Sequence, residues 1–529
     1  MIKVFNSNLS FFLIVIGTLF LYHFFLIPAN VDLSIGAFSQ FMDEQIFYDA
    51  IHAILNSENF SDLFANYAFG DQRYGRIIYL IGAVFAYFPE KFWGETGQII
   101  STRFLFSSTL FLSYILFVYV FIKENIHRII LFLLFMAIPT TAYYSTMPKP
   151  EPFLFLFFAS FCYFYFLKKA ANWHFIFLGL AYGCKVSLLV VVALIFLKES
   201  KLFSQRALNF QIPYLWNNIK FKLIFFTIGL GFAVPILPLS LINPSGIRSY
   251  LGSTLFNTTH GADSEHVNAL TWIHGIIFDW IQAPPILTIA LLVVISIPLI
   301  YLLSLNFRGQ FRSPYKFKFA VIVAVVSLVS ILFLVKRVWY MYLTFGVVFS
   351  LIVLMMTFEF IISQSKSHRY FGWMTILGSL LFSIYYLFPQ QKRELLSISK
   401  RTKTNEYKVQ MAKYHLYVDV LMKAKPLNKG GKISAFVDPY LFRLYSDDFK
   451  IEQFWGPFVD WEKGYDFVVL TNQSNPTFFL PPFKSAQNCL ICDISAQKFI
   501  QFVDNQKSSI QYHRYVSTKD GMVIYKRIN

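Results

Sequence analysis

The sequence predicts a polytopic α-helical membrane protein with a separate α/β domain at its C-terminal end. Of its 529 residues, 56% are hydrophobic and only 14% are charged, whereas an ordinary soluble domain has about 25% charged residues. Apolar runs recur that are long enough to cross a hydrocarbon core, which takes about 20 residues. After about residue 388 these runs give way to short apolar stretches bounded by turn residues, as in a soluble domain.

The membrane domain is expected to comprise residues 1–388. Its first apolar run, "LSFFLIVIGTLFLYHFFLIPA", is too long for a signal peptide and no A-x-A-like cleavage site follows it, so we interpret it as an uncleaved helix. We expect about eleven crossings, at 9–28, 101–122, 129–147, 151–167, 173–184, 186–197, 223–242, 284–305, 319–335, 338–362 and 371–388.

The loops between these spans alternate in charge. The positive-inside rule places the basic loops in the cytoplasm, which gives a cytoplasmic N-terminus and an external C-terminus. The cytoplasmic set contains Lys3, Lys123, Arg128, Lys168, Lys169, Lys198, Lys201, Arg206, Lys220, Lys222, Arg308, Arg312, Lys316, Lys318, Lys366 and Arg369, with Glu124, Glu199 and Glu359 as its acids.

The segment "HFIFLGLAYGCKVSLLVVVALIFL" decides this topology. As a single span it reverses every later loop and exports the basic segment 198–222. As a hairpin that turns near Lys185 it keeps the charge pattern, although each arm of about 12 residues is short for a span. The charge bias of the later loops favours the hairpin.

The C-terminal region, 389–529, is predicted to form an external α/β domain. "GKISAFVDPYLFRLYS" and "GYDFVVLTNQS" are typical of short buried strands, and "HRYVSTKDGMVIYKR" of a hairpin on Asp-Gly. Helical stretches are expected at 404–424 and 495–505. The net charge of +17 is spread over loops and this tail without a basic-aromatic module, so we expect no nucleic-acid partner.

The external loop at about 29–100 is the first place where chemistry is expected, because structureless loops of more than about 15 residues usually have a function. Within it, "DEQIFYDAIHAIL" and "YGRIIYLIGAVFAYF" have the character of helices that lie at the membrane interface. Its candidate residues are Asp43, Glu44, Asp49, Arg73 and Arg76.

Further candidates lie at the external ends of the spans: Lys149 and Glu151 in "TMPKPEPF", Lys185 at the hairpin turn, Lys336, Arg337 and Tyr340 in "VKRVWYMYLTF", and Asp263, Glu265 and His266 in "HGADSEHVNALTW". A structural alternative stands beside each: headgroup anchoring for Lys336 and Arg337, a Lys149–Glu151 pair that caps two helices, and solvated loop residues for the last group. Lys185 is harder to explain structurally, since a lysine at mid-membrane costs about 2.5–3.5 kcal/mol unless it has a partner or a route to water.

Together these groups suit transfer chemistry at the outer leaflet. A carboxylate can act as a general base, and cations at the membrane rim suit a lipid phosphate. Apolar grooves between helices can hold a long isoprenoid tail. Glycosyl transfer from a lipid-phosphate sugar requires this combination.

The ordered set of motifs resembles the GT-C superfamily of polyprenyl-phosphate-sugar-dependent glycosyltransferases, in particular the branch with protein O-mannosyltransferases and lipid A aminoarabinose transferases. "MDEQIFYDAIHAIL" resembles the acidic motif of the family's first external loop, and "FLGLAYGCKVSLLVVVALIFL" its glycine-lysine hairpin. "KRVWYMYLTFGVVFSLI" is similar to its R-Y-x-x-x-x-x-P segment, but the proline is absent, as is the Pro-Pro pair often found in the first external loop. The resemblance covers nearly the whole chain.

The resemblance implies an inverting displacement with Asp43 as the base and Glu44 as an acceptor-binding or tuning group. Lys149, Lys185, Lys336 and Arg337 would bind the departing polyprenyl phosphate. It implies a polyprenyl-phosphate-linked sugar donor, a glycan, lipid or protein acceptor, a lipid environment, and a bacterial inner membrane whose active site faces the periplasm. Since relatives differ in metal use and no ligand set is evident, we expect no essential metal or other cofactor.

Three alternatives remain. An O-antigen-type polymerase or ligase shares the lipid-linked donor but usually has its soluble part between helices. A secondary transporter is disfavoured by the near absence of charge within the spans and of repeated halves. A structural scaffold leaves the clustered external acids unexplained.

Overall fold

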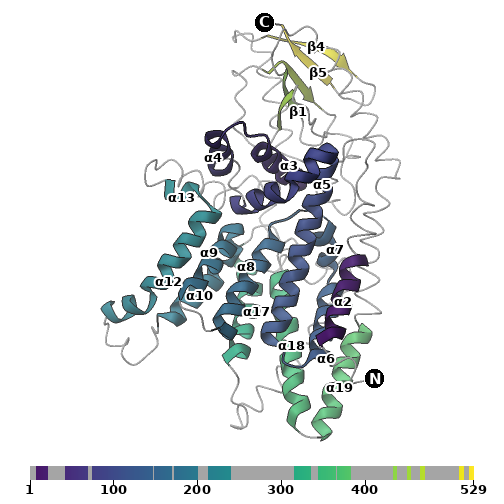
Figure 1. Cartoon of the computed structure of the whole chain (residues 1–529), viewed down its shortest axis with the longest axis vertical. Helices are drawn as coiled ribbons and strands as arrows, with labels where there is room; N and C mark the ends of the chain where they lie inside the picture. The colour runs from purple at the N-terminus through teal and green to yellow at the C-terminus, as the bar shows by residue number, and fades with distance from the viewer. Residues whose placement is uncertain are drawn as a thin grey trace. The chain divides into compact units, whose positions relative to one another are not determined.

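The computed structural model describes residues 8–21, 42–69, 74–146, 148–168, 172–200, 212–239, 315–334, 344–364, 366–382, 433–437, 449–453, 465–470, 511–517 and 523–528. The chain divides into a helical unit and a unit that contains the strands, and one boundary between them falls after Gln45, in the first turn of helix α3 (Met42–Leu55). Figure 1 shows the described helices and strands in chain order. The predicted span 284–305 and the predicted helical stretches in the tail lie outside the described residues.

The helical unit has helices wherever a predicted span lies in the described part of the chain. Among the described residues, three helical segments are long and apolar enough to cross a membrane, namely Thr96–Phe121, Glu151–Lys168 and Thr344–Ser363. The helices that follow the first external loop are α6 (Asn125–Ala137), α7 (Pro139–Thr146), α8 (Glu151–Tyr163), α9 (Phe175–Cys184), α10 (Leu189–Glu199), α12 (Ile212–Ala233), α13 (Ile236–Leu239), α17 (Tyr315–Leu334), α18 (Thr344–Gln364) and α19 (Lys366–Phe382); α2 (Asn8–Leu21) precedes it.

One predicted span is divided for a local reason. The span expected at 129–147 consists of α6 and α7, because Ile138 is extended before Pro139 (φ −62°, ψ 125°), as a residue before proline tends to be. Helix α8 continues into a π-helical turn, Phe164–Lys168.

The two stretches of segment 29–100 that were predicted as helices are helical, and a further helix, α4 (Phe60–Phe69), lies between them. Helix α3 (Met42–Leu55) buries Phe47, Tyr48, Ile51 and Ile54, positions that share one helical face. Helix α4 begins after Asn59, whose Oδ1 accepts a hydrogen bond from the backbone N–H of Asp62 at 2.9 Å. This is an N-cap bond of the ordinary kind.

Helix α5 (Arg76–Phe121) contains a sharp break at Gly94, which has φ 60° and ψ −149°. This conformation is essentially restricted to glycine. A Cβ on Gly97 would lie 2.1 Å from the carbonyl oxygen of Pro89, so the chain turns closely back on itself there. The break divides α5 into an arm that covers α3 and the apolar span Thr96–Phe121.

Helices α9 and α10 form the predicted hairpin. Lys185 is extended between α9 and the short 3₁₀ turn Val186–Leu188 (φ −159°, ψ 124°). The ring of Phe175, at the start of α9, lies 5.5 Å from that of Phe196, near the end of α10. The two arms therefore run antiparallel, and the chain reverses at Lys185.

Helix α9 packs closely on α12. A Cβ on Gly179 would lie 2.1 Å from the carbonyl oxygen of Phe226, and one on Gly229 would lie 2.1 Å from that of Ile176. One turn further along, a Cβ on Gly183 would meet the side chain of Ala233. Small residues four apart let helix backbones approach each other, a common device between membrane helices.

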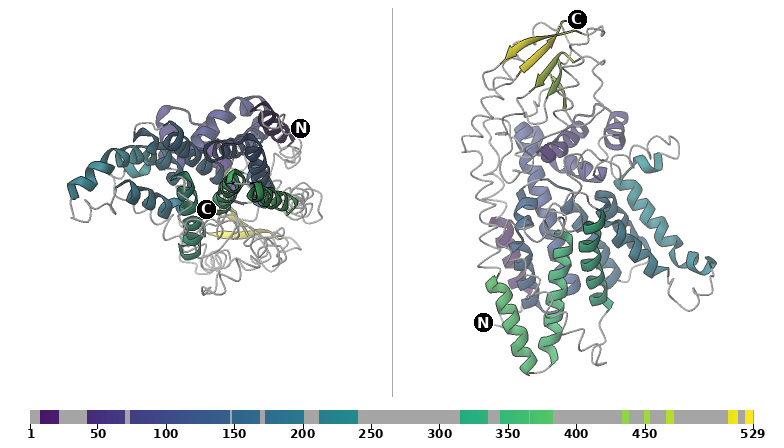
Figure 2. Two further views of the ribbon diagram at one scale, coloured as in Figure 1. Left: turned by 90° about the horizontal axis from the view of Figure 1, so that it is seen from below. Right: turned by 180° about the vertical axis from the view of Figure 1, so that it is seen from behind.

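The remaining helices α17, α18 and α19 lie side by side (Figure 2). Gly346 of α18 packs against Leu328 of α17, and Gly372 of α19 against Ile362 of α18.

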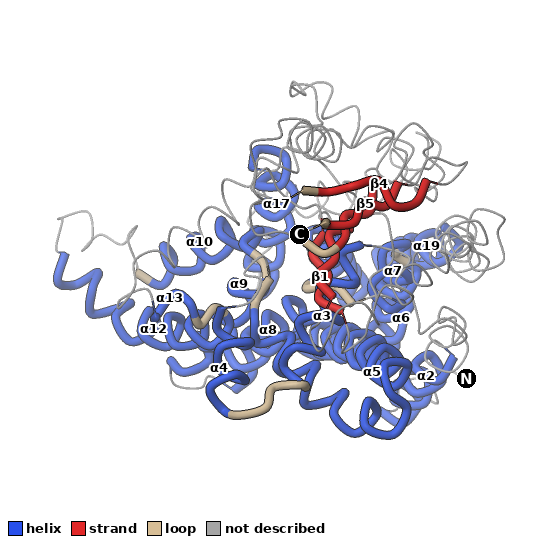
Figure 3. Tube along the Cα trace, turned by 90° about the horizontal axis from the view of Figure 1, so that it is seen from above, coloured by secondary structure: helices blue, strands red, loops and turns tan. Residues whose placement is uncertain are grey.

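The second unit contains a five-stranded sheet in the order β2-β1-β3-β5-β4. Strands β1 (Ile433–Val437) and β3 (Phe467–Leu470) lie in the segments predicted as strands, and β4 (Tyr512–Ser517) and β5 (Val523–Arg527) form the predicted hairpin (Figure 3). Strand β2 (Phe449–Gln453) was not predicted; it pairs parallel to β1. Since β1 and β3 are parallel and β3 and β5 are antiparallel, the sheet is mixed.

Candidate functional site

The turn before α8 places two charged residues in the protein interior. Lys149 is 4% exposed and Glu151 is 7% exposed, and they alternate with Pro148, Pro150 and Pro152. The prolines restrict the backbone of this turn. Glu151 is the first residue of α8, where the helix dipole favours a negative charge.

Lys185 is the partner of Glu151. Its Nζ donates to Oε1 of Glu151 in an ion pair between two largely buried side chains. The folding of the hairpin thus joins two charges that are 34 positions apart in the sequence. The structural alternative of a Lys149–Glu151 pair did not include this partner, Lys185.

The second carboxylate oxygen of Glu151 is not used by this ion pair. Oε2 of Glu151 is buried and has no hydrogen-bond partner among the described residues. A buried oxygen of this kind costs free energy unless it is satisfied. The cluster of Lys149, Glu151 and Lys185, which we call the lysine cluster, therefore has a capacity for at least one further polar contact.

The residue before α5 packs against the α9–α10 hairpin close to Lys185. A Cβ on Gly75 would lie 2.9 Å from the carbonyl oxygen of Gly183 and 3.1 Å from Cα of Cys184. Only glycine allows the backbone to come this close. The external loop is in this way held against the end of α9, next to Lys185.

Aromatic rings connect α3 with the beginning of α8. The ring of Phe106 on α5 lies 5.4 Å from that of Phe47 and 5.0 Å from that of Phe153. Phe153 is two residues after Glu151. The described part of α3 is therefore coupled by packing to the turn that contains the lysine cluster.

Buried polar groups of α5 fix α3. Gln98 Nε2 donates to the carbonyl oxygen of Tyr48 at 2.9 Å, and Arg103 Nε donates to its hydroxyl at 3.1 Å. All three residues are at most 2% exposed. The sequence interpretation missed Gln98 and Arg103, although an arginine at the start of an apolar span is a recognisable signal.

Arg76, a candidate for substrate binding, is buried at the beginning of α5. Its guanidinium donates to the backbone carbonyls of Asn66 and Tyr67 and lies over the ring of Tyr79. Cations commonly bind the last carbonyls of a helix. In this geometry Arg76 holds the end of α4 in place.

The other candidates stand as follows. Asp49 is half-buried on α3. Asp43 and Glu44 are in the first turn of α3, but their side chains are not among those described. Outside the described residues lie Arg73, Asp263, Glu265, His266, Lys336, Arg337 and Tyr340.

The opposite end of the helices carries members of the basic loops, and two of the three acids that accompany them there, Glu199 and Glu359, have local partners. Glu199 accepts hydrogen bonds from Lys222 Nζ at 2.5 Å and from the hydroxyl of Tyr165. Burial favours a higher pKa for Glu199, but these two hydrogen bonds and the positive charges of Lys222 and Lys198 outweigh it and keep the pKa below its usual value. Glu199 thus joins α8, α10 and α12.

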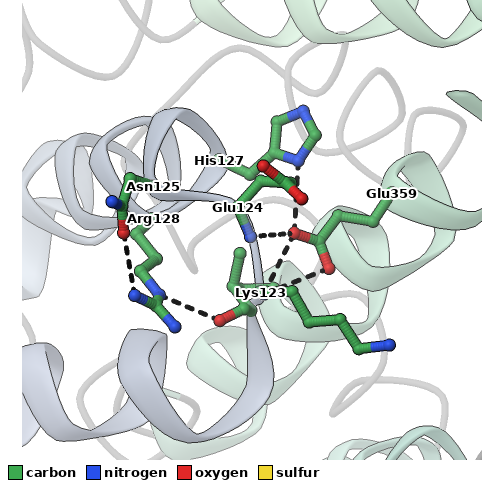
Figure 4. A network of polar contacts seen from close by, with 7 residues as sticks. Lys123, Glu124, Asn125, His127, Arg128 and Glu359 are labelled. Atoms are coloured by element: carbon green, nitrogen blue, oxygen red, sulfur yellow. Dashed lines mark hydrogen bonds and ion pairs between the residues drawn. The ribbon is translucent and has the colours of Figure 1, made fainter. Parts of the chain in front are cut away.

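Glu359 of α18 caps α6 in a similar way (Figure 4). Its carboxylate accepts the backbone N–H of Lys123 at 3.1 Å and that of Glu124 at 3.0 Å. Nδ1 of the buried His127 lies 3.2 Å from the same oxygen. Glu124 itself is exposed. The two ends of the helices therefore differ. At one end, carboxylates surrounded by cations connect neighbouring helices, and at the other end lies the lysine cluster.

The lysine cluster has the composition of an anion site. Lysine ammonium groups bind phosphate as point charges, and a carboxylate beside them can orient a lysine. Among the residues that the structure describes, no group of three or more His, Cys, Asp and Glu side chains could hold a metal ion.

Comparisons with known proteins do not identify the chain. No protein-family model matches it, and no characterised protein shows significant similarity to it.

Proposed function

We propose that the protein is an integral-membrane glycosyltransferase that transfers a sugar from a polyprenyl-phosphate carrier to an acceptor on the external side of the membrane. The observation that carries this proposal is the lysine cluster, in which Lys185 pairs with Glu151 and the buried Lys149 lies two residues before Glu151 in the chain. Buried charges in membrane proteins are costly, and they commonly mark ligand sites. A lipid phosphate supplies the anion that two buried lysines favour.

The distribution of charged residues between the two ends of the helices supports the same function. The described basic loops and their acids lie at the other end of the helices, so the positive-inside rule assigns the lysine cluster to the external side. The donor phosphate would bind there, at the level of the outer headgroups. The bacterial inner membrane and a periplasmic acceptor follow from the family resemblance.

In the proposed reaction, Asp43 removes the proton of an acceptor hydroxyl as that oxygen attacks the anomeric carbon. The bond from this carbon to the phosphate oxygen breaks, and the negative charge stays on the departing polyprenyl phosphate. Lys149 and Lys185 stabilise that charge, with Lys336 and Arg337 as further cations. Glu151 orients Lys185. An inverted anomeric centre is the expected product.

The experiment uses the purified protein in lipid with a panel of labelled polyprenyl-phosphate sugars and a mixture of acceptors. Donor binding is measured by thermal shift and transfer by the release of polyprenyl phosphate. We expect Asp43→Asn to bind donor and to lose a factor of about 10²–10⁴ in rate, the usual contribution of a general base. Lys185→Gln is expected to weaken donor binding.

Glu58→Gln is the matched control for Asp43→Asn, because Glu58 is an exposed carboxylate in the same external loop. It is expected to keep the wild-type rate. Transfer that survives Asp43→Asn would reject Asp43 as the base. If no donor of the panel binds, or if binding is the same in Lys185→Gln, the lysine cluster is only a structural ion pair and the proposal fails.

A further inference from the structure

The turn between α5 and α6 holds two cations on the last carbonyls of α5. Lys316 Nζ, from the first turn of α17, donates to the carbonyl oxygen of Val120 at 2.9 Å. Arg128 Nε donates to that of Ile122 at 2.9 Å, and its Nη1 donates to Oδ1 of Asn125 at 2.8 Å. The C-terminal end of a helix favours such positive charges. Both cations are therefore fixed in position by the backbone of one turn.

This capping uses only part of their hydrogen-bonding capacity. A lysine has three N–H donors and an arginine has five. Within the described part of the chain, Lys316 uses one and Arg128 uses two. Five donors on two fixed cations consequently remain for a ligand.

Among the residues that the structure describes, the cations also lack a counter-ion. Neither Lys316 nor Arg128 nor the neighbouring Lys123 forms an ion pair with a carboxylate of the described residues. The nearby carboxylate of Glu359 is occupied by the backbone N–H groups that it caps. Partial burial, together with the positive charges of Lys123 and Arg128, lowers the pKa of Lys316 below its usual value. An anion placed here would relieve that repulsion.

Apolar surface begins directly beside these charges. The Arg128 guanidinium lies 4.6 Å from the centre of the Tyr119 ring, which is itself exposed. Along α5, Leu112 lies seven positions before Tyr119 and is likewise exposed. These positions share a face of the helix. A ligand with an anionic head and long apolar chains would satisfy both parts of the surface.

We infer that the α5–α6 turn and the start of α17 form a binding site for the headgroup phosphate of an anionic phospholipid. Lys316 and Arg128 donate to the phosphate oxygens, Lys123 adds charge, and the acyl chains lie along the exposed Tyr119 and Leu112 of α5. Basic pockets between helices on the cytoplasmic side are known to hold such headgroups. This site lies at the opposite end of the helices from the lysine cluster, and it does not depend on the proposed function.

The test is native mass spectrometry of the full-length protein in detergent, titrated with dioleoyl phosphatidylglycerol, dioleoyl phosphatidylcholine or glycerol 3-phosphate. Each cation near an anionic lipid contributes roughly a factor of five in affinity. We therefore expect phosphatidylglycerol to bind at least about tenfold more tightly than phosphatidylcholine. The double variant K316Q/R128Q should lose this preference.

The double variant K91Q/K526Q removes the same number of charges elsewhere, from residues outside this turn, and should keep the preference. K316R/R128K, which preserves both charges, should keep most of it. If K316Q/R128Q fails to fold, K316Q alone is used, with an expected loss of about fivefold.

Equal binding of the two lipids would overturn the inference, as would a preference that K316Q/R128Q or K316Q retains. If glycerol 3-phosphate bound as tightly as phosphatidylglycerol, the ligand would be a free phosphate ester and not a lipid, and this result would also overturn the inference.

Discussion

Removal of the Glu359 carboxylate should loosen the start of α6 by a predictable amount. Glu359 accepts two backbone N–H groups at 3.0–3.1 Å and contacts the His127 ring at 3.2 Å, and its side chain is 16% exposed. The two N–H groups belong to exposed residues, so water can take the place of the carboxylate. The free energy lost at these two groups is therefore that of an ordinary N-cap, about 0.5–2 kcal/mol. His127 is buried, and the loss of its partner adds about 1–3 kcal/mol.

Glu359→Ala is therefore expected to reduce the free energy of unfolding by about 2–4 kcal/mol. Glu359→Gln should cost only about 1 kcal/mol, because its amide oxygen still accepts a hydrogen bond. The assay is equilibrium unfolding in mixed micelles, followed by circular dichroism. Glu58→Ala, which removes an exposed carboxylate, should stay within about 0.5 kcal/mol of the wild type.

A double-mutant cycle with His127→Phe separates the two contributions. In this background the cost of Glu359→Ala should fall by about 1 kcal/mol or more, because the buried ring no longer loses a partner. A cost for Glu359→Ala equal to that of Glu58→Ala would refute the capping argument. A cycle without coupling would refute the part assigned to His127.

Three further predictions concern other contacts. Because the pKa of Glu199 is lowered in the folded protein, its carboxylate stabilises the fold above the unfolded pKa of 4.5, and this stabilisation is lost as the pH falls through the lower folded pKa. The Glu199→Gln variant should therefore lose less stability over this pH range than the wild type when the two proteins are unfolded by acid side by side. Gly229→Val should destabilise the protein by about 1–3 kcal/mol, since the new side chain would meet a carbonyl oxygen of α9. Gly378→Val, at a position with open space around it, should cost less than about 1 kcal/mol in the same unfolding assay. Equal costs for the two variants would contradict the close packing of α9 on α12. Replacement of Glu151 and Lys185 by Gln, singly and together, should show a coupling of about 0.5–3 kcal/mol in that assay, and additive effects would mean that the ion pair contributes nothing.

The helical unit was largely predictable because hydropathy and charge act locally along the chain. A run of apolar residues forms a helix wherever it is placed in lipid, since every backbone group must be satisfied within the segment. The hairpin at Lys185 was predictable for a different reason: the charges of the later loops are compatible with only one arrangement. The number of crossings remains a prediction, with three helices of spanning length and composition among the described residues.

The long-range contacts were not accessible in the same way. Nothing in the sequence around Glu151 specifies that Lys185 is its partner, because this contact depends on how α8 and α9 pack. Strand β2 was missed because its five residues, "FKIEQ", are stabilised by pairing with β1 and have little strand character of their own. The catalytic assignment of Asp43 rests on the family resemblance and is tested by the experiment above.

The glycine contacts between α9 and α12 also fix a mechanical property of the molecule. A shift of α9 by a single residue, which combines a rise of 1.5 Å with a rotation of about 100°, would put the side chain of Leu180 or Leu178 where Gly179 now meets a carbonyl oxygen. The two helices therefore move as one rigid body, with a register that does not slip. Lys185, which follows the last residue of α9, is thereby held in a fixed position relative to α12.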